Sequence, residues 1–279
     1  MKKYLMPLIP ILVFNILQAI GGVIAFAIDA ISDIDKATAA FKTHDQAAIM
    51  GIMTPEALAW TVAITGVISV AIISLFKLIN WKTAVNFKQV DWKWAIIGLI
   101  GALVGVFASD ILEEMLDLPN ILEDQFISIS QTTIGFIAIG IVGPIVEEFI
   151  FRESILGYMT RKGVNKWTAI IISAVIFGLI HGNPAQIVFA GIMGIVLGIL
   201  YYKTGNIILP AILHMINNSV SVIIMASMGE DSKDASLVDL IGGQTSAIIN
   251  IIACSVICAA ILYLFWKNCK TPKLEISEE

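Results

Sequence analysis

The chain has few charged residues, few cysteines and no run of basic residues, and each scarcity excludes a class of protein. Lys, Arg, Asp and Glu make up 14% of its 279 residues, well below the roughly 25% of a typical soluble domain. Its three cysteines all lie near the C-terminus, too few for a disulfide framework or a Cys-rich metal centre. Without a basic run, we expect no nucleic-acid partner.

What the chain has instead is hydrophobic sequence, which makes up 58% of its residues and gives a mean hydropathy of +0.89. Apolar runs of about 20 residues cross a bilayer as helices. We therefore predict an all-α fold, a polytopic membrane helical bundle that forms a single transmembrane domain over residues 1–279, with the lipid bilayer as a partner. About eight transmembrane helices are expected, at residues 5–28, 57–79, 94–112, 131–158, 167–182, 185–202, 207–228 and 244–266.

Two local patterns refine the N-terminal part. Thr54, Pro55 and Glu56 are typical of a helix start, with a capping hydroxyl, a proline in the first turn and an acid beside the helix N-terminus. The segment before them is mixed in polarity and predicts a short amphipathic helix over about 33–50.

Basic and acidic residues gather at alternate ends of the expected spans. The basic ends carry Lys2, Lys3, Lys77, Lys82, Lys88, Lys93, Arg161, Lys162, Lys166, Lys203, Lys267, Lys270 and Lys273. The other ends carry mainly acids, at Asp29, Asp33, Asp35, Glu113, Glu114, Asp117, Glu123, Asp124, Glu230, Asp231, Asp234 and Asp239. The positive-inside rule then predicts a multi-pass plasma (inner) membrane protein with both termini in the cytoplasm.

Three charged residues interrupt the fourth expected span. Glu147, Glu148 and Arg152 follow the uncharged stretch 134–146. A charge at bilayer depth costs about 3 kcal/mol or more, so such residues face protein or water and indicate a functional site. The spacing of Glu148 and Arg152 also allows a purely structural ion pair on one helix face.

Polar residues of two other spans lie at a similar depth. Measured from the basic ends at about 1.5 Å per residue, Glu147 lies ~20 Å deep and His181 ~21 Å deep. On the same scale His214 lies ~12 Å deep and Asn218 ~18 Å deep. Two of the three histidines in the chain can therefore meet the carboxylates near the middle of the membrane.

Simpler interpretations exist for each part. His214 and Asn218, four residues apart, could hold helices together by hydrogen bonds. A separate local feature is Pro144, which frees a backbone carbonyl and can kink the fourth span close to the glutamates. A second glutamate pair, Glu113 and Glu114, has no nearby arginine or matching histidine and is interpreted as a solvated helix end.

Taken together, the three segments resemble the CAAX-prenyl-protease and bacteriocin-processing (CPBP, or Abi) family of intramembrane proteases. Residues 147–152 match EExxxR, residues 177–181 match FxxxH, and residues 214–218 match HxxxN, in the family's order. The resemblance implies an eight-span bundle with a cavity accessible from the cytoplasm, and a catalytic core over residues 130–228. Relatives remove the last three residues of prenylated CAAX proteins, or are linked to bacteriocin maturation, self-immunity and the regulation of membrane proteins.

The chemistry expected of these residues is peptide hydrolysis by an activated water, on a peptide or protein substrate at the membrane. Glu147 is predicted to take a proton from the water, with His181 orienting the water or sharing the proton. His214 and Asn218 would donate hydrogen bonds to the oxyanion. Glu148, held ionised by Arg152, would orient the site, although the two glutamates could exchange roles.

Two alternatives stay open at this point. Two histidines and a glutamate could bind a catalytic zinc ion, although the chain lacks an HExxH motif. The glutamate mechanism, by contrast, needs no cofactor and no metal. The protein could also bind a peptide or partner without cleaving it, as an immunity factor, a membrane chaperone or a transporter with a buried ion pair.

Overall fold

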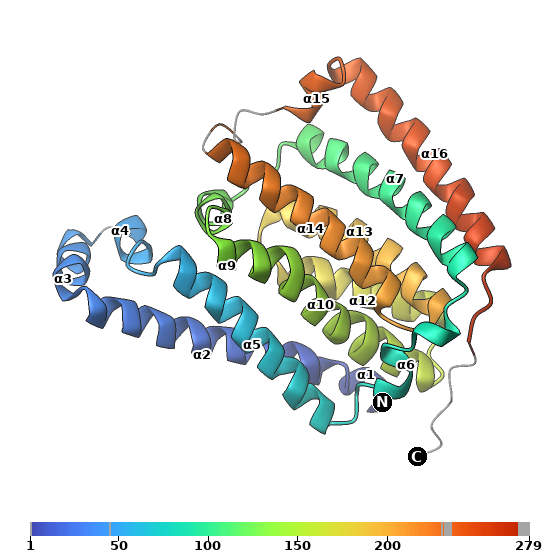
Figure 1. Ribbon diagram of the computed structural model, residues 1–279, viewed down its shortest axis with the longest axis horizontal. Coiled ribbons are helices and arrows are strands. Elements are labelled where there is room, and N and C mark those ends of the chain that lie inside the picture. The colour runs from blue at the N-terminus through green and yellow to red at the C-terminus, as the bar shows by residue number, and fades with distance from the viewer. Residues whose placement is uncertain (1, 45, 230, 232–235, 273–279) are drawn as a thin grey trace.

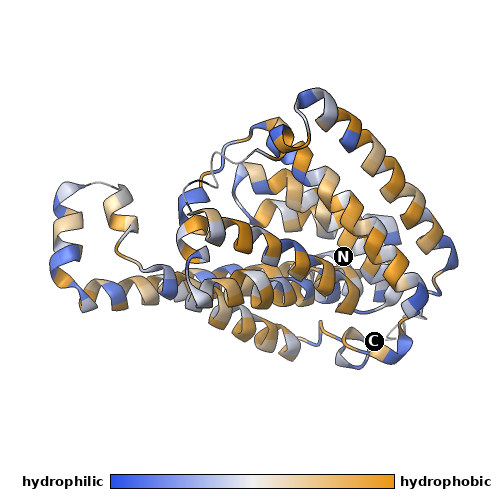
Figure 2. Cartoon of the chain, turned by 45° about the horizontal axis from the view of Figure 1, so that its top comes forward, coloured by the Kyte–Doolittle hydropathy of each residue, from blue (hydrophilic) through white to orange (hydrophobic). Residues whose placement is uncertain are grey.

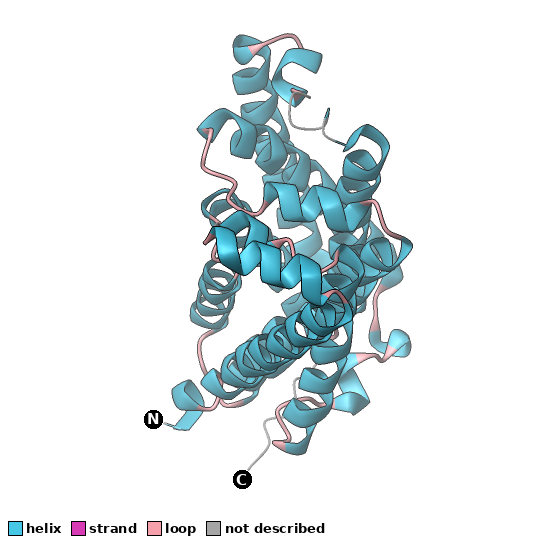
Figure 3. Cartoon of the chain, turned by 90° about the vertical axis from the view of Figure 1, so that its left-hand side faces the viewer, coloured by secondary structure: helices cyan, strands magenta, loops and turns pink. Residues whose placement is uncertain are grey.

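The computed structural model describes residues 2–44, 46–229, 231 and 236–272. Helices joined by loops make up this part of the chain, and it contains no strand (Figure 3). The predicted all-α fold is therefore confirmed. Glu230, Asp234 and Lys273, which contributed to the predicted charge pattern, lie outside the described residues.

Seven helical segments among these residues are long and apolar enough to cross a membrane. They are α2 (Leu8–Ser32), α5 (Pro55–Leu75), α7 (Trp92–Leu116), the fourth span (Thr133–Arg161), α13 (Pro184–Thr204), α14 (Ile208–Met228) and α16 (Gln244–Asn268). The remaining predicted span is α12 (Lys166–Ile180). Its 15 residues extend ~22 Å, less than the ~30 Å of a hydrocarbon core.

Short elements connect the spans. They are α1 (Lys2–Leu5), α3 (Ile34–Thr43), α4 (Gln46–Met50), α6 (Trp81–Ala84), η1 (Phe87–Gln89), α8 (Glu123–Ser130) and α15 (Leu237–Leu240). The amphipathic segment predicted over 33–50 is two helices, since His44 adopts a left-handed conformation that ends α3. The predicted start of the second span is confirmed, because Thr54 Oγ1 accepts a hydrogen bond from the amide of Ala57 at 3.2 Å.

The bundle has a central group of helices with a helix pair on either side (Figure 1). The pair α2 and α5 packs on one side, and the pair α7 and α16 on the other. Between them lie the fourth span, α12, α13 and α14. Helices α3 and α4 project away from the rest, and they carry more hydrophilic residues than the spans (Figure 2).

The fourth span is not a regular α-helix. It consists of α9 (Thr133–Gly135), η2 (Phe136–Val142), α10 (Gly143–Glu147), η3 (Glu148–Gly157) and α11 (Tyr158–Arg161). Both η2 and η3 are π-helical, a wide form of helix found frequently at functional sites. Glu147 is the last residue of α10 and Glu148 the first residue of η3, so the second π-helical segment begins at the glutamate pair.

The interpretation of Glu113 and Glu114 as a solvated helix end is wrong for Glu114. Glu114 accepts hydrogen bonds from the amides of Leu237 (2.8 Å) and Val238 (3.1 Å) and from the hydroxyl of Ser236. It thereby holds the start of α15 against α7. None of these three partners could be predicted from the sequence, because each contact joins segments more than 100 residues apart.

Candidate active site

Pro144 determines how the fourth span meets α14. A proline has no amide hydrogen to donate. An amide at position 144 would bond the carbonyl of Gly140 in an α-helix or that of Ile139 in a π-helix, so both carbonyls lack this partner. The amide of Asn218 donates to Ile139 O at 3.3 Å, and the hydroxyl of Ser219 donates to Gly140 O at 3.2 Å. The two side chains of α14 therefore dock on the two freed carbonyls, which fixes this helix against the glutamates.

Glu148 is the buried member of the glutamate pair. Its side chain is fully buried, with Oε2 at 3.1 Å from Arg152 Nε and Oε1 at 3.0 Å from His214 Nδ1. The carboxylate therefore joins two groups, one on its own helix and one on α14. The predicted contact of Glu148 with Arg152 is confirmed, while its contact with His214 was not predicted.

Arg152 is buried in an unusual environment. Its nitrogen Nε is close enough to Glu148 for an ion pair, but the angles do not make a hydrogen bond. None of its three guanidinium nitrogens has a hydrogen-bond partner among the described residues. Its guanidinium carbon lies 4.3 Å from the centre of the Phe177 ring. The cation is thus balanced by one carboxylate and one aromatic face.

Glu147 lies on the opposite edge of the His214 ring from Glu148. Its side chain is 23% exposed, and its Oε2 lies 3.6 Å from His214 Nε2. The two nitrogens of His214 therefore face the two consecutive glutamates. The imidazole of His214 is itself 3% exposed, and its hydrogen bond to Glu148 at 3.0 Å orients the ring, whereas the contact with Glu147 is longer than a hydrogen bond.

His181 directly follows the last residue of α12. Its Nδ1 lies 2.7 Å from the carbonyl oxygen of Phe177. A carbonyl can only accept, so Nδ1 carries the hydrogen and Nε2 keeps a lone pair when the ring is neutral. Phe177 also packs edge-on against both imidazoles, with centroids 5.0 Å from His181 and 5.6 Å from His214.

Most of the residues described above line a cavity of about 570 Å³. Glu147, Phe177, His181, His214 and Asn218 all contribute to its wall, whereas Glu148 and Arg152 do not. The structure therefore brings together all six residues that the sequence singled out, four at the cavity and two behind it. Among the two glutamates, only Glu147 can reach a molecule in the cavity.

The cavity extends toward the acid-rich end of the bundle. Its lining includes Glu113 near the end of α7, the exposed Asn120, and Leu122 just before α8. The positive-inside rule places this end outside the cell, whereas the resemblance implies access from the cytoplasm. These two expectations are therefore not satisfied together.

A second buried charge cluster was missed by the sequence analysis. Glu153 is fully buried and accepts hydrogen bonds from Arg161 (2.7 Å), Tyr201 (2.6 Å) and the amide of Asn80 (3.0 Å). Glu153 follows Arg152 directly in the sequence, which is the one signal that could have drawn attention to it. The cluster does not line the cavity, and its role is to join the fourth span to α13 and to the loop after α5.

Other chemistries find less support among the described residues. The hydroxyls of Ser173 and Ser219 donate to the carbonyls of Phe151 and Gly140, and neither residue lines the cavity. No three His, Cys, Asp or Glu side chains in the described part are placed to hold a metal ion.

The fold and these residues define a polytopic helical membrane protein with glutamates, histidines and an arginine gathered within the bundle. Residues 129–220 match the family model described as type II CAAX prenyl endopeptidase Rce1-like. The part of the chain that carries the six site residues therefore resembles this family of membrane CAAX proteases.

Three curated proteins are similar to the chain. The putative membrane peptidase YdiL of Bacillus subtilis is 37% identical over 95 residues, which are 34% of this chain and 38% of that protein. The membrane-embedded CAAX protease MroQ of Staphylococcus aureus is 30% identical over 155 residues, 51% of this chain and 62% of MroQ. The UPF0177 protein YxdF of Lactococcus lactis is 29% identical over 160 residues, 51% of this chain and 85% of that protein. The first two matches thus span less than two thirds of the relative.

No solved structure matches the chain significantly.

Proposed function

We propose that the protein is an intramembrane endopeptidase that hydrolyses a peptide bond of a membrane-associated peptide or protein with a water activated by Glu147. The observation that carries this proposal is that Glu147 alone of the two glutamates lines the cavity, together with both histidines. The similarity to a CAAX protease and to a putative membrane peptidase supports the same reaction class.

Glu147 is the general base of this mechanism. Its carboxylate is partly exposed to the cavity, so a water there can donate a hydrogen bond to it. The His181 Nε2 is free because Nδ1 donates to the Phe177 carbonyl. A water between Glu147 and His181 would have two acceptors for its two hydrogens, which leaves an oxygen lone pair for attack on the scissile carbonyl. Glu147 takes one proton of this water as the C–O bond forms and gives it to the amide nitrogen as the C–N bond breaks, so that the product leaves as a neutral amine.

His214 and Asn218 stabilise the oxyanion. Since Nδ1 of His214 donates to Glu148, only a second proton, on Nε2, lets His214 donate to substrate. Asn218 uses one amide hydrogen on Ile139 and has a second one to donate.

Glu148 and Arg152 are positioning residues in this mechanism. Neither lines the cavity, so they act on the substrate through His214. Glu148 fixes the hydrogen of His214 on Nδ1 and supplies a negative charge next to the ring, while Arg152 places a positive charge next to that carboxylate.

The proposal is tested with purified protein in nanodiscs and a library of fluorogenic peptides tethered to the membrane. Wild type is compared with Glu147→Gln, which keeps the shape of the side chain but cannot accept a proton, each with and without a zinc chelator. Cleavage that is lost in the variant and unaffected by the chelator supports the mechanism. Loss of cleavage with the chelator would move the chemistry to zinc, and full activity of a folded Glu147→Gln protein would overturn the assignment of the base.

A further inference from the structure

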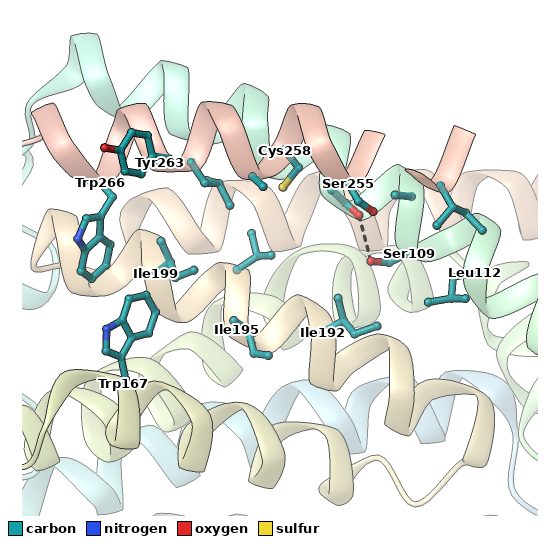
Figure 4. A pocket seen from close by; sticks show the side chains of 16 residues that line it. Ser109, Leu112, Trp167, Ile192, Ile195, Ile199, Ser255, Cys258, Tyr263 and Trp266 are labelled. Carbon is teal, nitrogen blue, oxygen red and sulfur yellow. Dashed lines mark hydrogen bonds between the residues drawn. The ribbon is translucent and has the colours of Figure 1, made fainter. Parts of the chain in front are cut away.

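A second cavity lies between α7, α13 and α16, on the side of the bundle away from α2 and α5 (Figure 4). Its volume is about 530 Å³, and Ser109, Ser255 and Cys258 are among the few polar groups of an otherwise apolar wall. It shares no lining residue with the cavity at Glu147. The two cavities are therefore separate, and an occupant of this one does not touch the candidate active site.

The cavity is an elongated groove on the lipid-facing surface. Along α16 its lining runs from Ile251 to Trp266, 15 residues or ~22 Å, longer than the ~15 Å of one leaflet's hydrocarbon. Its rim is open, since Tyr263 is 63% exposed and Trp167 45% exposed. Water would find few hydrogen-bond partners in such a groove, so hydrocarbon chains of the bilayer are its natural filling.

At one end of the groove, two lysines and a third aromatic ring lie beside the lining residues Trp167 and Trp266. Trp167 and Tyr202 stack on Trp266, with centroid distances of 4.9 and 5.6 Å, and Figure 4 shows Trp167 and Trp266 together at this end. The ammonium groups of Lys166 and Lys203 lie 4.8 and 5.2 Å from the centre of the Trp266 ring. Tryptophan and tyrosine favour the level of the lipid headgroups.

This pair of lysines lacks an acidic partner in the part of the chain that the structure describes. Lys203 is 7% exposed, so water solvates its charge poorly. Two ammonium groups beside the same ring repel each other, and an anion between them would remove that repulsion. The end of the groove thus offers positive charge and an aromatic wall directly above an acyl-length apolar channel.

We infer that this groove binds an anionic phospholipid of the surrounding bilayer. One acyl chain lies between α13 and α16, and the phosphate lies at Lys166 and Lys203. The polar end and the apolar channel match the two parts of such a lipid. The inference does not depend on the proposed peptidase activity.

Native mass spectrometry of the purified full chain tests the headgroup. The protein is equilibrated with equal amounts of phosphatidylglycerol and phosphatidylcholine that carry identical chains, and retained lipid is counted. Wild type is expected to retain phosphatidylglycerol in preference. In the double variant Lys166→Gln, Lys203→Gln the preference should fall by roughly tenfold or more, because each lysine near an anionic lipid contributes a factor of about five.

Matched variants separate this site from general electrostatics. Lys267→Gln removes a charge directly after Trp266 in the sequence. Unlike Lys166 and Lys203, which lie 4.8 and 5.2 Å from the centre of the Trp266 ring, Lys267 is not part of this cluster, so the variant should keep the preference. The double variant Lys166→Arg, Lys203→Arg keeps both charges and should restore it. Equal retention of the two lipids by wild type, or an equal loss in Lys267→Gln, would overturn the inference.

A second pair of variants tests the channel. Ala259 lines the groove and Ala260 does not, although both are exposed on α16. Ala259→Trp should fill the channel and reduce retained phosphatidylglycerol several-fold, while Ala260→Trp should leave it unchanged. If both variants retain as much lipid as wild type, the acyl chain does not lie in this groove.

Discussion

His214 and Glu148 form a buried contact between two helices, with Nδ1 of the histidine 3.0 Å from Oε1 of the glutamate. Glu148 is fully buried and His214 is 3% exposed. The contact leaves Nε2 of the imidazole directed at the second glutamate, Glu147. A pair of adjacent glutamates therefore divides into one that holds the histidine and one that faces the cavity.

This division predicts different results for the two glutamates. Glu147→Gln should reduce kcat by about 10²–10⁴-fold, the usual contribution of a general base, with little change in thermal stability. Peptide cleavage and a melting curve in the same detergent measure both. A folded variant with wild-type kcat would exclude Glu147 as the base.

Glu148→Ala should instead affect folding. It leaves Arg152 as a buried cation without a carboxylate, and breaking a buried ion pair in this way costs about 3–5 kcal/mol. Thermal unfolding followed by size-exclusion fluorescence should show a large decrease in Tm. A Tm equal to that of Glu147→Ala, the matched control at the partly exposed neighbour, would contradict this role.

Phe177→Leu should lower kcat more than it raises KM. The ring contacts both imidazoles and the guanidinium of Arg152, so its loss loosens three groups of the site at once, whereas it is one of many side chains in the cavity wall. Steady-state kinetics separates the two parameters. Phe151→Leu, which removes a ring that packs on Phe177, is the control, and it should change kcat less.

Pro144→Ala should weaken activity while preserving the bundle. The alanine amide can bond a carbonyl of the preceding turn, in competition with Asn218 and Ser219. We expect a decrease in kcat of several-fold with a normal elution profile, measured against Pro210→Ala in the first turn of α14. Unchanged kcat would show that the freed carbonyls do not position Asn218.

Gly157→Ala should destabilise the protein without reaching the cavity. An added methyl group would collide with the hydroxyl of Tyr201 and approach Arg161 Nη1 to 2.9 Å, which disturbs the cluster around Glu153. A lower Tm is expected. Gly191→Ala is the matched control, because a methyl group there meets nothing within 4 Å and alanine favours the helix.

Cysteine labelling can determine which side of the membrane the cavity faces. Gln125→Cys, at the acid-rich end of the cavity lining, should react with an impermeant maleimide added outside intact cells if the Lys-rich end is cytoplasmic. Background from Cys269 should be low, because burial raises the pKa of its thiol to about 11 and the thiolate is the reactive form. Labelling only after permeabilisation would show that the acid-rich end faces the cytoplasm, the opposite of the orientation predicted from the charge pattern.

The sequence by itself determined the class of fold and singled out the six residues of the candidate site. Hydrophobic runs of bilayer length specify helices whatever their neighbours, because backbone groups in lipid must bond within their own segment. Charges within such runs are costly enough to be informative one at a time, which is why Glu147, Glu148 and Arg152 stood out.

Only the tertiary structure decided how these residues are divided between roles. The direction of each glutamate depends on contacts with α14, more than 60 residues away, and on π-helical turns that residue spacing does not reveal. The same reason explains the missed partners of Glu114 and Glu153. A side chain's depth follows from its position along one helix, but its partners follow from the packing of several helices.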